Sequence, residues 1–141
     1  MASGILHIYV DGSCEENRNV TADTPAGWGF CVVSGDTGLG RGRGHILHEV
    51  CGPVVTRSGS EGFLGAEIGS NNTAELSAIA QATRWLLESG EEQEVVIRSD
   101  SQYALNIASG EWRAKKNKAL AKRTQELWNE VSSLRKLSGE H

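Results

Sequence analysis

The hydrophobic pattern of this sequence changes its period near residue 70, and that change constrains the fold more than any other feature. Near the N-terminus apolar residues such as Leu6, Ile8 and Val10 alternate with more polar ones. A period of two is typical of a half-buried strand. After residue 70 apolar residues recur every three or four positions, the spacing of one helix face. The chain is therefore predicted to begin as a β-meander and to continue with helices.

The expected elements follow from this pattern and from the glycines and caps that interrupt it. Strands are predicted over residues 4–11, 28–34, 45–56 and 94–99, and helices over 72–89, 101–109 and 118–137. Asn72 and Asn117 stand at predicted N-caps, and Gly90 and Gly110 at predicted helix ends. A strand–helix–strand crossover after a meander implies an α/β fold, in which a three-stranded antiparallel meander and parallel strands form one mixed sheet with helices packed on it.

Length and composition indicate an ordinary single domain spanning residues 1–141. Hydrophobic residues make up 38% of the 141 residues, and no run of 18 apolar residues occurs, so no membrane partner is expected. Cys14, Cys31 and Cys51 are scattered, without the spacing of a disulfide framework or a zinc site. With no secretory signal at the N-terminus, an intracellular location is expected.

The charge of the chain is unevenly distributed. The net charge is −4, but residues 1–112 hold 6 Lys/Arg against 15 Asp/Glu, whereas residues 113–141 hold 8 against 3. Six basic residues and no acidic one fall within residues 113–123. Such polarity suits an acidic metal site beside a ridge that contacts phosphates, although a solvated basic helix face would look the same.

Three acidic residues occupy comparable places in the predicted fold. Asp11 and Asp100 each end a strand, and Glu75 lies in the first turn of the helix between those strands. If the two strands are adjacent and parallel, the three carboxylates meet at one edge of the sheet. Crowded carboxylates repel one another unless a cation lies between them, and oxygen ligands suit Mg²⁺ or Mn²⁺. The pattern thus predicts a site for two such ions.

Each of these acidic residues also has a purely structural interpretation. Glu75 would complete a capping box with Asn72, Asp100 would cap the short helix, and Asp11 would cap a turn at residues 12–13. The spacing leaves these alternatives open.

Four short segments, in this order, resemble the type I ribonuclease H family. They are residues 9–14 (YVDGSC), 26–30 (AGWGF), 71–76 (NNTAEL) and 98–103 (RSDSQY), and the resemblance covers about residues 4–137. It implies endonucleolytic hydrolysis of the RNA strand of RNA–DNA hybrids with two divalent ions, Mg²⁺ or alternatively Mn²⁺. Asp11, Glu75 and Asp100 would be the catalytic metal ligands.

The resemblance also implies which residues contact the hybrid. Asn71, Asn72 and Gln102 match family positions near the cut, where amides distinguish the RNA 2′-hydroxyl, and Cys14 matches a position near the DNA strand. Trp112, Lys115 and Lys116 match the DNA-binding region of the family.

The sequence departs from the family at its C-terminus. The family continues with a fifth strand and a helix that carries a fourth catalytic Asp, whereas no Asp follows Asp100 before the chain ends at His141. The expected domain is therefore incomplete, with an open strand edge for a second chain or a swapped segment, and weak or inactive alone. Two alternatives are a module that binds hybrid or RNA without cutting it, and a ribonuclease H segment of a reverse transcriptase.

Overall fold

The structure is a computed structural model that describes residues 5–14, 26–34, 45–53, 71–90, 93–115 and 117–141. Its strands are β1 (Ile5–Cys14), β2 (Ala26–Ser34), β3 (His45–Pro53), β4 (Glu94–Arg98) and β5 (Leu137–Glu140), and its helices are α1 (Asn71–Ser89), α2 (Gln102–Ser109) and α3 (Lys118–Leu134). Residue 4 of the first predicted strand and residues 54–56 of the third lie outside the described residues.

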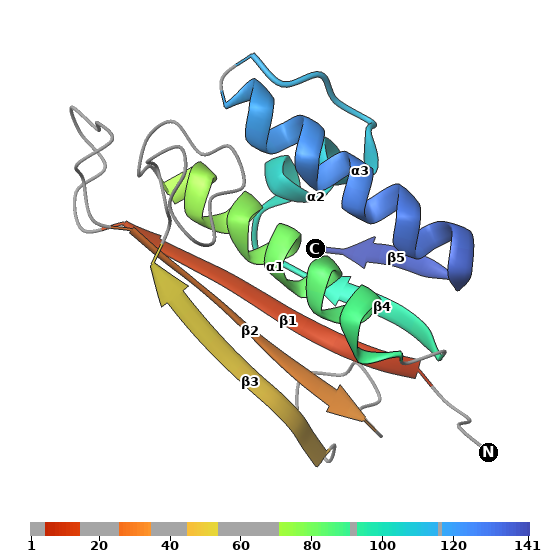
Figure 1. The fold of residues 1–141 in the computed structure, drawn as a ribbon. Helices are drawn as coiled ribbons and strands as arrows, with labels where there is room; N and C mark the ends of the chain where they lie inside the picture. Colours follow the sequence, from red (N-terminus) through yellow and green to blue (C-terminus); the bar gives the residue numbers. More distant parts are fainter. Residues whose placement is uncertain (1–4, 15–25, 35–44, 54–70, 91–92, 116) are drawn as a thin grey trace.

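The five strands form one mixed sheet in the order β3-β2-β1-β4-β5. β1, β2 and β3 are an antiparallel meander, and β4 is parallel both to β1 and to β5. All three helices lie on one side of this sheet (Figure 1). The predicted fold class is therefore confirmed, including the parallel contact between the first and fourth strands.

The core lies between the sheet and the helices. Leu6, Ile8 and Val10 point from β1 into it, and the alternating pattern of the first strand thus reports correctly which face is buried. On α3 the apolar face is buried through Val131, and Trp128 is 6% exposed. Leu134, the last residue of α3, is 66% exposed because the helix ends there and the chain turns toward β5.

The expected absence of a fifth strand is wrong. Leu137–Glu140 runs along β4, with Val95 opposite Leu137 and Arg98 opposite Glu140, so the edge of β4 is occupied (Figure 1). Arg98 strengthens this pairing because its guanidinium contacts Glu140 at 3.0 Å and donates to His7 Nδ1 on β1 at 2.9 Å. The helix expected to reach residue 137 instead ends at Leu134, and the following Arg135 is extended. The predicted docking of a second chain or swapped segment on β4 therefore loses its basis.

Several element ends also differ from the expectation. β1 continues beyond Asp11 to Cys14 because Ser13 and Cys14 pair with β2, which starts at Ala26. α1 begins at Asn71, so Asn72 lies inside the helix rather than at its cap. Asn117 does precede α3, but its backbone is left-handed (φ 51°) and its side chain caps nothing. No helix in the described part of the chain is long and apolar enough to cross a membrane.

Candidate active site

Asp11 and Asp100 lie toward the same end of the sheet. β1 and β4 are parallel, and Tyr9 lies opposite Arg98. Asp11 follows Tyr9 by two residues, and Asp100 follows Arg98 by two residues. Neighbouring strands are about 4.8 Å apart, which keeps the two backbones close at this point. Both aspartates are exposed, as residues must be if they are to meet a ligand from solvent.

The first turn of α1 rests directly on β1 beside Asp11. A Cβ atom on Gly12 would lie 2.4 Å from both the carbonyl carbon of Ala74 and the nitrogen of Glu75, so only a glycine permits this approach. The contact joins Gly12 of the strand to Ala74 of the helix, which are 62 positions apart in the chain. It brings Glu75 to the same end of the sheet as the two aspartates.

The carboxyl group of Glu75 is buried and only partly satisfied. The residue is 6% exposed, and its carboxylate accepts hydrogen bonds from the Gly12 backbone N–H and the Ser99 hydroxyl. Ser99 in turn accepts a bond of 3.0 Å from the Ser101 N–H, which orients its hydroxyl toward Glu75. Among the residues that the structure describes, the Oε2 atom of Glu75 has no hydrogen-bond partner. A buried carboxylate oxygen without a partner is costly and indicates a site that a cation would complete.

The electrostatics of the three carboxylates are coupled. Burial raises the pKa of Glu75 above its usual value, and the negative charges of Asp11 and Asp100 raise it further. Hydrogen bonds from Gly12 and Ser99 lower the pKa without reversing the shift. The charges of both aspartates thus reach Glu75.

The donor set fits a divalent cation chemically, although the side chains are not gathered around one point. Among the described residues no group of three or more His, Cys, Asp or Glu side chains is arranged to hold a metal ion. The three carboxylates offer only oxygen ligands, which hard cations such as Mg²⁺ prefer. The unpaired Oε2 of Glu75 and the mutual repulsion of the three groups both favour binding of positive charge there.

The stability of the metal-free protein is expected to depend on pH through Glu75. Because the folded pKa is raised, the folded state holds this proton more tightly than the unfolded state does. Stability should therefore fall as the pH rises from the unfolded pKa, near 4.3 for glutamate, through the raised folded pKa. Urea unfolding at a series of pH values measures this, and Glu75→Gln should remove the decline. A decline that persists unchanged in Glu75→Gln would contradict the assignment.

The three purely structural interpretations do not hold in the structure. Ser101, rather than Asp100, caps α2, because its hydroxyl accepts from the Ala104 N–H at 3.0 Å. Asp11 lies within β1, which runs on through residues 12–14 without a turn. Glu75 bonds to Gly12 and Ser99, and the helix start at Asn71 removes the three-residue spacing of a capping box.

The residues expected to contact substrate surround this centre unevenly. Asn72 and Gln102 are exposed, in the first turns of α1 and α2 respectively. Trp112 is 49% exposed and meets Tyr103 edge-on at 6.4 Å, and Lys115 is exposed farther along the same connection. Asn71 begins α1 and Cys14 ends β1, but their side chains are outside the description, as is Lys116 altogether.

Three features near this site were not predicted from the sequence. Ser99 gave no signal, because a serine before Asp100 has no distinctive spacing. The buried Asn117 amide donates to the Thr73 hydroxyl at 2.9 Å and so ties the start of α3 to the first turn of α1. His141 Nε2 lies 2.8 Å from the carbonyl oxygen of Asp100, a contact that depends on β5. Of the three, only Asn117 gave a signal, and the sequence indicated an N-cap there rather than a buried residue with a left-handed backbone.

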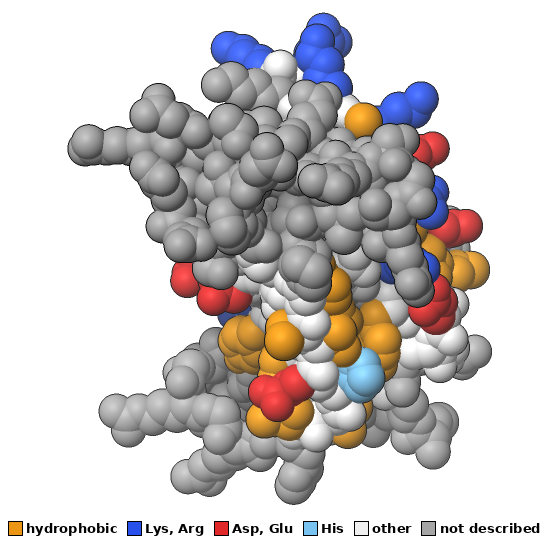
Figure 2. Space-filling model, turned by 60° about the vertical axis from the view of Figure 1, so that its left-hand side comes forward, with side chains coloured by type: hydrophobic (Ala, Val, Ile, Leu, Met, Phe, Trp, Pro, Cys, Tyr) orange, Lys and Arg blue, Asp and Glu red, His pale blue; other side chains and the backbone are white. Residues whose placement is uncertain are grey.

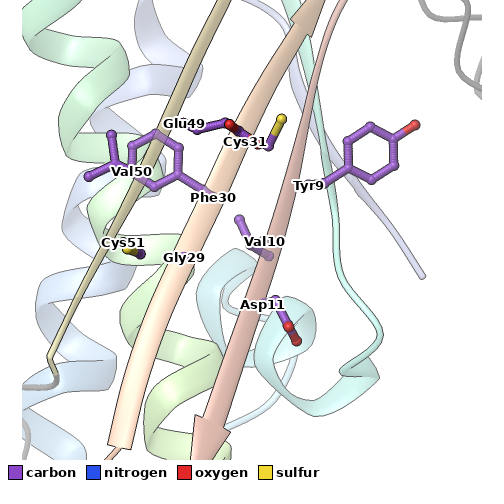
Figure 3. A pocket seen from close by; sticks show the side chains of 9 residues that line it. All are labelled: Tyr9, Val10, Asp11, Gly29, Phe30, Cys31, Glu49, Val50 and Cys51. Carbon is purple, nitrogen blue, oxygen red and sulfur yellow. The ribbon is translucent and has the colours of Figure 1, made fainter. Parts of the chain in front are cut away.

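A pocket of about 500 Å³ gives access to Asp11 from the sheet face opposite the helices. Gly29 of the central strand β2 pairs with Asp11 of β1 on one side and with Cys51 of β3 on the other. Two residues along β2, Cys31 pairs with Tyr9 of β1 and Glu49 of β3 in the same way. Because Gly29 has no side chain, the floor between Asp11 and Cys51 is open, and Figure 3 shows Asp11 and Glu49 toward opposite ends of the hollow. The described Lys and Arg side chains that are visible in Figure 2 lie mainly at its upper end.

Comparison of the sequence with known protein families identifies the class of protein. The family model described as RNase H matches residues 4–140, and the chain therefore belongs to the RNase H family. Members of this family generally use divalent metal ions, in agreement with the oxygen-rich centre. A search of curated protein sequences finds no significant match.

Solved structures of known proteins have the same fold. RNase H1 from the halophilic archaeon Halobacterium salinarum superposes with a TM-score of 0.66 at 24% identity, covering 98% of this chain and 85% of the other. The N-terminal RNase H domain of a Mycobacterium tuberculosis protein gives 0.66 at 21% identity, covering 99% and 81%. LC11-RNase H1, a protein isolated from compost, was solved in complex with an RNA/DNA hybrid and gives 0.62 at 23% identity, covering 96% and 84%.

Proposed function

We propose that this protein hydrolyses the RNA strand of RNA–DNA hybrids endonucleolytically, with Asp11, Glu75 and Asp100 holding two divalent cations. The observation that carries the proposal is the buried Glu75 carboxylate, whose unpaired Oε2 lies within electrostatic reach of both aspartates. Membership of the RNase H family and the hybrid-bound state of LC11-RNase H1 support the choice of substrate.

The residues of the chain divide the work in this proposal. Asp11 and Asp100, which are exposed, would hold one Mg²⁺ or Mn²⁺ ion, and Glu75 would hold the other. When bound, the two cations supply positive charge for the attacking and leaving oxygens of the phosphodiester. Ser99 and the Gly12 N–H fix the orientation of Glu75. Asn72 and Gln102, with donors and acceptors on one group, recognise the RNA 2′-hydroxyl, and Asn71 is assigned the same role from its motif.

A cleavage assay on labelled hybrids tests the proposed function. With Mg²⁺ or Mn²⁺ the RNA strand should be cut internally to 3′-hydroxyl and 5′-phosphate ends, and EDTA should abolish the reaction. The same RNA as a single strand, and the DNA strand of the hybrid, should stay intact. Cleavage of single-stranded RNA at the same rate, or cleavage in EDTA, would exclude the proposal. Saturable hybrid binding without any cleavage would instead support a binding module.

The exposed residues after α2 are proposed to hold the DNA strand. The indole of Trp112 packs edge-on against Tyr103, and Lys115 supplies a positive charge for a phosphate. Lys116 and Cys14 are assigned to contacts with the DNA strand from their motifs. Basic residues concentrated in one part of an acidic protein produce a local positive potential, and such a potential attracts the phosphates of a nucleic acid.

Hybrid binding should weaken with salt, and Lys115→Ala should lower the slope of log affinity against log salt by about 1. Trp112→Ala should weaken binding at every salt concentration with little change of slope, because the indole contributes packing rather than charge. Fluorescence anisotropy between 50 and 200 mM salt measures both.

Lys136→Ala provides the matched control for this charge change. Lys136 pairs with Glu94 at 3.6 Å at the opposite end of β4 from Asp100, so it should leave the slope unchanged. Equal loss of slope in Lys136→Ala and Lys115→Ala would show that only net charge matters, and would contradict a localised DNA contact.

A further inference from the structure

A second pocket, of about 320 Å³, adjoins the carboxylate centre on the helix side of the sheet. It lies between α2 and the end of β5, and His141 closes it next to Asp100 through the contact of 2.8 Å with the Asp100 carbonyl oxygen. Gln102, the residue expected to contact RNA, lies on its wall. The other residues that line the pocket have no role in the proposed function.

The pocket has polar walls and an apolar floor. Gln102, Asn106 and Ser109 are spaced four and three residues apart on α2, so they share one helix face, and Ser138 of β5 also lines the pocket. Leu105 and the largely buried ring of Trp128 also line it. A flat heterocycle that hydrogen-bonds at its edge and is apolar on its face matches both kinds of surface.

The charges of the lining distinguish a base from a phosphate. Glu111 lines the pocket, and among the described residues that do so there is no lysine or arginine. A carboxylate repels phosphate but accepts a hydrogen bond from an amino group. Amides such as Asn106 pair with the amino and ring-nitrogen edge of adenine, and carboxylates accept from the amino group of cytosine. The volume is at the lower limit of ordinary ligand pockets, which suits one base rather than a base pair.

We propose that this pocket binds a single unpaired nucleobase that carries an exocyclic amino group, beside the phosphate held at the carboxylate centre. The assignment to a base of the substrate rests on the proposed function, whereas recognition of a free nucleoside does not. Asn106 and Glu111 set the preference for the amino group, and Leu105 and the small accessible part of Trp128 contact the apolar surface of the base.

Titration of the full chain with free nucleosides tests the pocket without any hydrolysis. The indole N–H resonance of Trp128 should shift with adenosine, less with uridine, and not with ribose 5-phosphate. Glu111→Ala should weaken adenosine binding about three- to tenfold, the value of one hydrogen bond, and Asn106→Ala should do the same. Glu111 is exposed, so its replacement should leave the fold intact. Asn129→Ala, an exposed asparagine of α3 outside the pocket, is the matched control.

A second measurement relates the pocket to the substrate. A hybrid whose RNA carries one unpaired terminal adenosine should bind more tightly than the same hybrid with an abasic residue there, and Glu111→Ala should remove this difference. If adenosine shifts the Trp128 resonance but hybrids are neither bound nor cut, nucleobase binding in the pocket is supported and the nuclease proposal fails. If hybrids are cut but adenosine, uridine and ribose 5-phosphate act alike on Trp128, the pocket proposal is overturned. Absence of any nucleoside effect also overturns it.

Discussion

Asp11→Asn is expected to reduce hydrolysis of the RNA strand by about 10²- to 10⁴-fold. Loss of one cation ligand removes several kcal/mol of charge stabilisation, and each 1.36 kcal/mol corresponds to a tenfold change in rate. Asparagine keeps the size of the side chain and one oxygen, so the fold of β1 should be preserved. The rate of hybrid cleavage under single-turnover conditions measures the effect.

Metal binding gives an independent measure of the same change. The thermal midpoint of the unaltered protein should rise with added Mg²⁺ or Mn²⁺, because a ligand that binds only the folded state stabilises it. This rise should shrink in Asp11→Asn. Glu49→Gln is the matched control, since Glu49 lies on the same open face but opposite Cys31, in the row of Tyr9 rather than of Asp11. Equal losses in the two variants, or full activity in Asp11→Asn, would exclude Asp11 as a ligand.

Gly12→Ala is expected to destabilise the protein by about 3 kcal/mol or more. The added Cβ would lie 2.4 Å from two backbone atoms of α1, and backbone cannot move aside as a flexible side chain can. The helix start must shift away from β1, which also displaces Glu75 from Gly12 and Ser99. For a domain of this size the midpoint of thermal unfolding should fall by roughly 10 °C, and cation binding should weaken in the molecules that remain folded.

Gly29→Ala separates this steric effect from the general cost of altering a strand glycine. A Cβ on Gly29 would meet its nearest neighbour, the Val50 carbonyl oxygen, at 3.6 Å, which is ordinary contact distance. That variant should keep its stability within about 1 kcal/mol. A Gly12→Ala protein as stable as Gly29→Ala would mean that α1 does not rest on β1 as described.

The local pattern of the sequence was sufficient for most of the secondary structure. Alternation at Leu6, Ile8 and Val10, and the glycines that follow α1 and α2, report interactions between residues close together in the chain. Such signals are readable because strand and helix periods act over a few residues. The four motifs likewise led to the RNase H family, since each is a short run of residues.

Element ends and the fifth strand were not predictable in this way. Leu137–Glu140 shows little apolar alternation, and it is a strand because β4 offers an unpaired edge and Arg98 offers a partner for Glu140. β1 extends to Cys14 because β2 pairs with it there. Both the fifth strand and the longer first strand depend on pairing with residues that are distant in the sequence, and a local sequence pattern contains no information about such pairing.

The sequence by itself determined the strand and helix order, the family, and which three carboxylates to consider. Only the tertiary structure decided how they meet: Gly12 allows α1 to touch β1, and this contact buries Glu75 next to Ser99 with one oxygen unpaired. The physical reason is that burial and electrostatic coupling depend on the distance between residues 11, 75 and 100 in space. Their separation along the chain leaves that distance undetermined until the sheet and its helix have packed.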